Sequence, residues 1–297
     1  MADLHHQRAG ALRRDAERVS GTLSPLLVEA ERLVSTLALG QHGRRRAGIG
    51  ESFWQYRNAE PGDSLSQIDW RRSGRSDRLY VREMEWEAAE TVLLWCDRAQ
   101  AMEFRSDRAP CTKAERGALL ALALAVLLNR GGERFALLGS EAERPGMGET
   151  QLVRIATLLG ATASDAPEFG TPPAGLMPKA GKAIFFSDFM GPREAILPAL
   201  LNAAGQGMGG AMVMILDPVE EEFPFQGRTR FESATGRIRH ETDEAAGLRQ
   251  KYLSRLAARR DELARIARRA NWNLILHRTD EDARTPLLRL HALLGGA

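Results

Sequence analysis

Several features that would place this chain in a specialised class are missing from its sequence. It has two cysteines in 297 residues, too few for a disulfide framework, which fits a reducing, cytoplasmic compartment. The longest apolar run, from Ala118 to Leu128, is too short to span a bilayer, and the polar N-terminus has no signal-peptide core. We therefore expect no integral membrane anchor. The 41 basic and 39 acidic residues nearly cancel, so we expect no nucleic-acid partner held mainly by phosphate contacts.

Familiar catalytic motifs are missing as well. The sequence has no Gly-x-x-x-x-Gly-Lys-Ser/Thr loop, so the chain is not itself a P-loop ATPase, and it has no Gly-x-Ser-x-Gly elbow or His-Glu-x-x-His pair. Its six histidines show no metal-ligand spacing, and neither cysteine has an activating neighbour motif. We therefore expect that the protein is not an enzyme and has no catalytic residues.

Alternating strand-like and helical patterns are present from residue 91 onwards. Continuous apolar runs at 91–96, 135–138, 182–187, 211–216 and 272–277 suit parallel strands that are covered on both faces. Helical periodicity is found at 113–129, 150–159, 193–204, 243–270 and 285–294, and Thr112 could cap the first of these helices. Residues 91–297 are therefore predicted to form an α/β domain with a mostly parallel, Rossmann-type sheet and helices on both faces.

Four other segments show weaker patterns. Apolar residues recur at helical spacing from Leu26 to Ala38, so we expect residues 1–40 to be an N-terminal helical segment that packs on the later domain. Residues 41–90 should form a small β-rich segment of short strands and loops, with one strand near 79–83. Residues 160–180 are rich in Ala, Pro and Gly and should form an exposed linker loop, whereas 222–240 suit a hairpin.

The least generic residues are spread through the segment 48–85 and recur near the end of the chain. They are Gly50, Phe53, Arg57, Pro61-Gly62-Asp63, Ile68-Asp69-Trp70, Ser73, Leu79 and Glu83, followed later by Leu216-Asp217-Pro218 and His277-Arg278-Thr279-Asp280. In this order they resemble the DUF58 family. The resemblance implies a bacterial protein in which this segment precedes a von Willebrand factor A-like (vWA) domain. It also implies a MoxR-type AAA+ ATPase as the partner.

Two carboxylates and one hydroxyl are candidates for a metal site. Asp97 and Asp188 each follow a predicted strand, and Thr150 opens a helix. Ligands of open α/β sheets bind beyond the carboxyl ends of the strands, and such oxygen groups suit Mg²⁺. The family resemblance implies an Asp-x-Ser-x-Ser metal-ion-dependent adhesion site, but Ala99 and Ala101 stand where its two serines would be. We therefore predict a degenerate site with Mg²⁺ bound weakly or not at all. The alternative role for both carboxylates is ion pairing or capping.

The resemblance implies a non-catalytic protein-interaction module, acting as adaptor or substrate-recruiting partner of the MoxR-type ATPase in assembly or maturation of protein complexes. The contact residues that we expect are Arg57, Asp63, Asp69, Trp70, Arg71 and Gln100. Core packing is the alternative for Trp70, since large aromatic side chains bury well. Two other functions stay open. One is a metal-assisted hydrolase using Asp97 and Asp188, and the other is nucleic-acid binding through the arginine cluster of residues 44–82.

Overall fold

The computed structural model describes most of the chain. The described residues are 24–40, 53–59, 68–75, 78–84, 90–161, 166–173, 181–237 and 239–295. Predicted features at residues 1–23, 41–52 and 60–67, including Arg44 to Arg46 and Asp63, lie outside these ranges.

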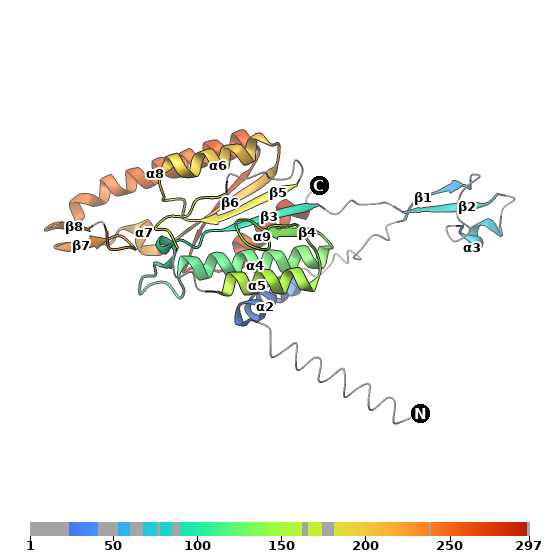
Figure 1. Ribbon diagram of the computed structural model, residues 1–297, viewed down its shortest axis with the longest axis horizontal. Helices are drawn as coiled ribbons and strands as arrows, with labels where there is room; N and C mark the ends of the chain where they lie inside the picture. Colours follow the sequence, from blue (N-terminus) through green and yellow to red (C-terminus); the bar gives the residue numbers. More distant parts are fainter. Residues whose placement is uncertain are drawn as a thin grey trace, which may run out of the picture.

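One five-stranded sheet organises the domain (Figure 1). Its members are β3 (Thr91–Cys96), β4 (Arg134–Leu137), β5 (Lys182–Ser187), β6 (Gly209–Leu216) and β9 (Asn273–Arg278), in the order β4-β3-β5-β6-β9. Every neighbouring pair in this sheet is parallel. The predicted α/β fold with a mostly parallel sheet is therefore confirmed.

The strands are apolar throughout because both of their faces are covered. Side chains of successive strand residues point to opposite faces. Accordingly, Val92 and Leu94 of β3 belong to one apolar core, and Leu93 and Trp95 belong to the other. Each fully buried side chain of this size contributes roughly 1.5–3 kcal/mol to the free energy of folding.

Helices form a layer on each side of the sheet (Figure 1). The first layer contains α2 (Pro25–Gly40), α4 (Lys113–Gly131), α5 (Glu149–Gly160) and α9 (Arg284–Gly295), and the second contains α6 (Arg193–Gly205) and α8 (Ala246–Ala270). Leu27, Ala30 and Val34 of α2 share the first core with α4, so the expected packing of the N-terminal helix on the later domain is confirmed.

The start of α4 is fixed by a reciprocal cap. Thr112 Oγ1 accepts a hydrogen bond from Glu115 N at 3.0 Å, and Glu115 Oε2 accepts one from Thr112 N at 2.8 Å. This capping box satisfies two backbone donors that the helix leaves free, and a cap of this kind contributes about 1 kcal/mol. Gly132 ends the helix with a left-handed backbone, at φ 76°. The cap places Lys113 at the first helical position, from which its ammonium reaches Asp188 after the central strand β5.

Asp217, one of the residues on which the family resemblance rests, organises the segment that follows β6. Asp217 is the N-cap of the short helix α7 (Pro218–Glu222), and its Oδ1 accepts from Val219 N at 2.9 Å. Its Oδ2 accepts from Ser106 N at 2.8 Å, which fixes the loop that follows β3. The chain then forms an antiparallel hairpin of β7 (Thr229–Glu232) and β8 (Arg239–Thr242), as predicted. Asp217 therefore has a structural role beside the strand ends.

A small unit precedes the sheet in sequence. β1 (Phe53–Asn58) pairs antiparallel with β2 (Tyr80–Met84), and the short helix α3 (Trp70–Ser73) lies between them in the chain. Ser73 Oγ accepts from Tyr80 N at 2.9 Å, which ties α3 to β2. No described residue of this unit belongs to either apolar core of the α/β domain.

Candidate functional site

The strand order creates one natural site. The chain reverses its direction of sheet growth between β3 and β5, which are neighbours although β4 lies between them in sequence. Loops from such neighbours leave in opposite directions and open a crevice at the carboxyl ends of the strands. Asp97 follows β3 and Asp188 follows β5 at this point, and both are buried. The structure therefore brings these two predicted residues to one place.

Both carboxylate oxygens of Asp97 accept hydrogen bonds from nearby groups. Ser187 Oγ donates to Asp97 Oδ2 at 2.6 Å, and Ala99 N donates to Oδ1 at 2.9 Å. Burial raises the pKa of the Asp97 carboxyl, and these two hydrogen bonds act in the opposite direction. Asp97 thus joins the end of β3 to the end of β5, with a hydrogen bond at each of its oxygens.

The segment 166–173 covers Asp97. Gln100 N and Ala101 N donate to the carbonyls of Pro167 and Glu168, at 2.9 Å and 3.0 Å. A Cβ on Gly170 would lie 2.1 Å from Asp97 Oδ1, so only glycine permits this approach. The expectation of an exposed linker is therefore wrong for these residues, because a small residue lets the backbone pack onto the carboxylate.

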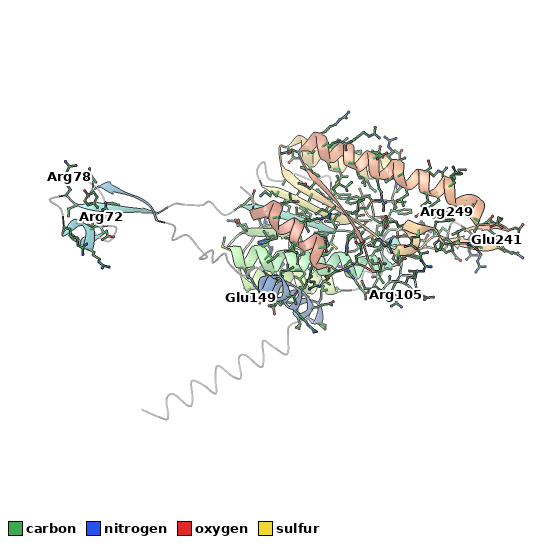
Figure 2. The ribbon with its side chains drawn as sticks, turned by 180° about the vertical axis from the view of Figure 1, so that it is seen from behind. Arg72, Arg78, Arg105, Glu149, Glu241 and Arg249 are labelled. Atoms are coloured by element: carbon green, nitrogen blue, oxygen red, sulfur yellow. The ribbon has the colours of Figure 1, made fainter. Side chains whose placement is uncertain are left out.

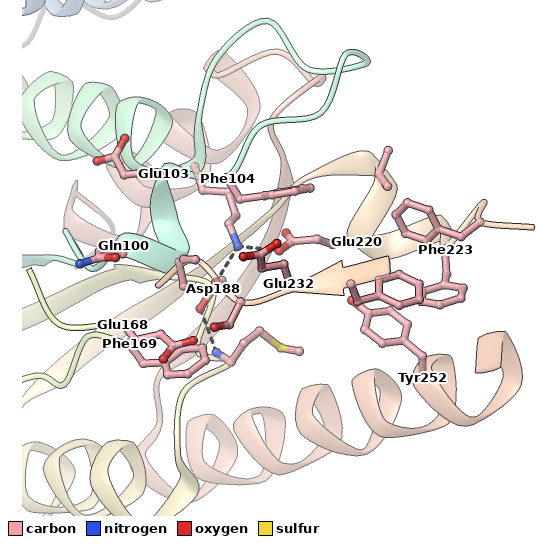
Figure 3. A pocket seen from close by; sticks show the side chains of 18 residues that line it. Gln100, Glu103, Phe104, Glu168, Phe169, Asp188, Glu220, Phe223, Glu232 and Tyr252 are labelled. Atoms are coloured by element: carbon pink, nitrogen blue, oxygen red, sulfur yellow. Dashed lines mark hydrogen bonds and ion pairs between the residues drawn. The ribbon is translucent and has the colours of Figure 1, made fainter. Parts of the chain in front are cut away.

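The second carboxylate is paired with a buried lysine. Lys113, with 1% of its side chain exposed, donates from Nζ to Asp188 Oδ2 and to Glu220 Oε1, both at 2.7 Å (Figure 3, dashed lines). Met190 N donates to the other oxygen, Asp188 Oδ1, at 2.9 Å. Burial alone lowers the pKa of Lys113, but Asp188 and Glu220 together raise it above its ordinary value. The ammonium therefore stays charged at neutral pH.

Thr150 does not join the two carboxylates. The chain after β4 turns back, and Gly146 bridges Phe135 near the amino end of the sheet before α5 begins. The last turn of α5 is at the other end, where Arg98 Nη1 donates to the Leu158 carbonyl. Figure 2 places Glu149, the first residue of α5, and Arg105, from the loop after β3, well apart in the α/β domain. Thr150 is exposed in that first turn, so the predicted three-residue ligand set is not assembled.

The residues at the strand ends do not fit a Mg²⁺ ion. Ala99 and Ala101 offer no side-chain oxygen, and both oxygens of Asp97 already accept hydrogen bonds. Asp188 faces the Lys113 ammonium, whose charge would repel a cation. Among the described residues, no cluster of three or more His, Cys, Asp or Glu side chains is arranged to hold a metal.

The other predicted contact residues are divided between two places. Gln100 lies at the strand ends, and its Nε2 donates to the Ala166 carbonyl at 2.9 Å. Asp69 caps α3 by accepting from Arg72 N at 3.0 Å. Trp70 and Arg71 lie on the same short helix, and 59% of Trp70 is exposed. The core-packing alternative for Trp70 is therefore wrong. Arg57 lies in β1 with only its backbone described, and Asp63 lies outside the described residues.

A pocket of about 510 Å³ opens beside the Lys113 ion pairs (Figure 3). We call it the aromatic pocket. Its aromatic lining is Phe104, Phe169, Phe223, Phe225, Phe231 and Tyr252, and its acidic lining is Glu103, Glu168, Asp188, Glu220 and Glu232. The walls come from the loop after β3, from segment 166–173, from α7, from the β7–β8 hairpin and from α8.

Sequence reasoning missed the role of Lys113 and this aromatic lining. One signal for Lys113 was available. A cation in the first turn of a helix opposes the helix dipole, so a lysine at this position indicates a carboxylate nearby that stabilises it. The aromatic lining comes from separate segments, and local sequence gives no indication that they converge.

A family model described as "Protein of unknown function DUF58" matches residues 55–262. The chain belongs to the DUF58 family. Mycobacterial relatives of this DUF58 protein are the uncharacterized proteins Rv1480 of Mycobacterium tuberculosis strain H37Rv and Mb1516 of Mycobacterium bovis. Each is 26% identical over 290 residues, which cover 94% of this chain and 90% of the relative.

Two solved structures are also similar to this DUF58 protein. One is the conserved hypothetical protein BatB from Bacteroides thetaiotaomicron, with a TM-score of 0.40 and 11% identity over 70% of this chain and 99% of that one. The other is an aerotolerance-related membrane protein from Bacteroides fragilis, with a TM-score of 0.41 and 10% identity over 71% of this chain and 100% of that one. Within the described part of the DUF58 chain, no helix combines the length and apolar character needed to cross a membrane.

Proposed function

We propose that this DUF58 protein is a non-catalytic protein-interaction module with a vWA-like α/β domain. It serves as adaptor or substrate-recruiting subunit of a MoxR-type AAA+ ATPase in the assembly or maturation of protein complexes. The observation that carries the proposal is the ion pair of Lys113 with Asp188 at the strand ends. An internal ammonium there supplies the positive charge that a vWA domain takes from its metal. The crevice is then left for recognition of a protein surface.

The exposed face of α3 supports the same proposal. Trp70 is the most exposed large apolar side chain of the described residues, and Arg71 beside it is exposed as well. Trp and Arg are the residue types most often found to dominate binding energy at protein interfaces. We therefore assign the ATPase contact to α3, with the strand-end crevice free to receive a substrate protein.

The hydrolase alternative has less support. It requires a metal-bound water between Asp97 and Asp188, and in this site Asp97 accepts hydrogen bonds at both oxygens while Asp188 is paired with Lys113. Nucleic-acid binding is favoured by one observation: Arg71, Arg72 and Arg75 are exposed beside Trp70. Exposed aromatic and basic side chains together bind single strands.

Co-purification with the MoxR-type ATPase of the same organism tests the proposal. The full chain is assayed with and without ATP and Mg²⁺, as wild type and as Trp70→Ala. The control is Leu201→Ala, which removes another exposed apolar side chain, on α6, where 49% of Leu201 is exposed. We expect a nucleotide-sensitive complex that Trp70→Ala weakens and Leu201→Ala leaves intact. If no complex forms in any nucleotide state, the adaptor function is refuted. Salt-sensitive binding of a single-stranded oligonucleotide instead would favour the nucleic-acid alternative.

A further inference from the structure

The aromatic pocket has a chemistry of its own, which the ion pair of Lys113 does not explain. Four rings make one continuous wall: Phe223 lies 5.6 Å from Phe231 and 4.9 Å from Tyr252, measured between ring centroids, and Phe225 meets Phe231 edge to face at 5.1 Å. The volume of the aromatic pocket, about 510 Å³, lies within the range of roughly 300–1,000 Å³ that ligand pockets occupy.

The backbone at this wall is strained. Phe223 ends α7 with φ 46°, in the left-handed region that bulky residues avoid. Such a conformation costs on the order of 1–3 kcal/mol and is maintained only where the surroundings enforce it, often at ligand sites. Its result is to place the Phe223 ring between Phe231 of the hairpin and Tyr252 of α8. The strained backbone of Phe223 therefore fixes the position of the aromatic wall.

The carboxylates of the pocket exceed the cations that balance them. Arg239 pairs with Glu232 at 3.1 Å, and the single ammonium of Lys113 is shared between Asp188 and Glu220. Glu168 has no ion-pair partner among the described residues, and Figure 3 shows it within the lining beside Phe169. The pocket therefore carries a net negative charge in the described part of the chain.

Glu168 also has an unused acceptor. Its Oε2 accepts from Thr235 Oγ1 at 3.0 Å, but its Oε1 is buried and has no hydrogen-bond partner among the residues that the structure describes. A buried carboxylate oxygen without a donor is costly, and native proteins rarely keep one without a reason. This oxygen can accept a hydrogen bond from a bound group, and the negative charge of the lining favours a positively charged donor.

We propose that the aromatic pocket binds an arginine side chain presented by a partner protein. A guanidinium stacks on aromatic faces and also donates forked hydrogen bonds to a carboxylate, so it matches both components of the lining. Its aliphatic stem would lie along Phe231 and Tyr252 while its head reaches Glu168. This inference rests on the proposed interaction function and specifies what it recognises: a basic segment of the substrate protein.

Binding of a short peptide to the full-length, ¹⁵N-labelled protein tests the inference by NMR. The probe is acetyl-Gly-Ser-Arg-Ser-Gly-amide, and the matched probe carries citrulline, which keeps the shape of arginine without its charge. We expect saturable shifts of the Glu168, Phe223 and Phe231 amides with the arginine probe, and binding at least about tenfold weaker with citrulline. Equal binding of the two probes, shifts confined to other surfaces, or no shifts at all would overturn the proposal.

Three variants separate the pocket from general charge attraction. Glu168→Gln keeps the size of the side chain and should weaken the arginine probe at least about tenfold. Phe231→Leu should also weaken it, because a ring is lost from the wall. Glu241→Gln removes an exposed carboxylate on β8 that does not line the pocket, and it should leave affinity unchanged. Equal affinity of wild type and Glu168→Gln contradicts the assignment, and dispersed spectra verify that each variant is folded.

The same variants distinguish this inference from the adaptor function. Glu168→Gln should still co-purify with the ATPase, because the ATPase contact is assigned to Trp70 on α3. If the ATPase binds and the arginine probe does not, the adaptor function stands and the pocket proposal fails. If the probe binds and the ATPase does not, the pocket proposal stands and the adaptor function fails.

Discussion

Lys113 Nζ donates a hydrogen bond of 2.7 Å to Asp188 Oδ2 and so joins the first turn of α4 to the carboxyl end of β5. A lysine at this helix position opposes the helix dipole at a cost of about 0.3–1 kcal/mol. The carboxylates of Asp188 and Glu220 offset that cost. The switch point of the sheet therefore contains a positive charge that belongs to the protein itself.

Replacing Lys113 should destabilise the fold strongly. Lys113→Met leaves the buried Asp188 and the partly buried Glu220 without a cation, so we expect a loss of about 3–5 kcal/mol in the free energy of unfolding. Urea denaturation measures it, with Lys251→Met, an exposed lysine of α8, as the control. Adding Asp188→Asn and Glu220→Gln to Lys113→Met should recover part of the loss. Equal stability of Lys113→Met and Lys251→Met would show that the ion pairs of Lys113 contribute nothing.

Gly170 should tolerate no side chain. In Gly170→Ala the new Cβ meets Asp97 Oδ1 at 2.1 Å, so segment 166–173 must move away from Asp97. Overpacking of this kind costs about 1–3 kcal/mol. Gly160→Ala is the matched control, because a Cβ there meets no atom within 4 Å, and its effect should stay within about 0.5 kcal/mol. Thermal unfolding of both variants measures the difference, and an unaffected Gly170→Ala protein would mean that the segment does not pack on Asp97.

His277 should make stability depend on pH. Burial and the neighbouring Arg116 lower the pKa of His277 from 6.5 to about 4, and Arg116 Nη1 lies 3.2 Å from His277 Nε2. The unfolded chain therefore binds a proton at higher pH than the folded protein does. The contribution of His277 is complete well above pH 6.5 and declines as the pH falls towards 4, by about 3 kcal/mol in total.

The difference between wild type and His277→Asn isolates this effect from other titrating groups. Chemical denaturation at pH 7, 6 and 5 should show the wild type losing stability more steeply than the variant. Parallel curves for the two proteins would mean that His277 titrates normally in the folded state.

The sequence was sufficient for the sheet because the information there is local. The apolar run of β3 and the cap of α4 at Thr112 are each contained in a few neighbouring residues, and so are the carboxylates that follow β3 and β5. Thr150 was misplaced because the chain after β4 returns along the strand, with Gly146 bridging Phe135, and this short segment has no periodic pattern.

The remaining features of the site depend on contacts between distant residues. Lys113 meets Asp188 and Glu220 across 75 and 107 residues of sequence. Trp70 is exposed although its size alone favours burial, and no described residue of its small unit belongs to a core of the α/β domain. Neither outcome can be predicted from residues adjacent in the chain.

The central claim is that Lys113 supplies the charge that a metal would otherwise bring to the strand ends. Calorimetric titration of Mn²⁺ into wild type and into Lys113→Ser tests it most directly. Removing the ammonium exposes Asp188 and Glu220 as oxygen ligands and adds a hydroxyl, so the variant should bind one Mn²⁺ and unfold at a higher temperature with the ion present. The wild type should give no binding heat. A one-to-one Mn²⁺ isotherm for the wild type, unchanged in Lys113→Ser, would contradict the account.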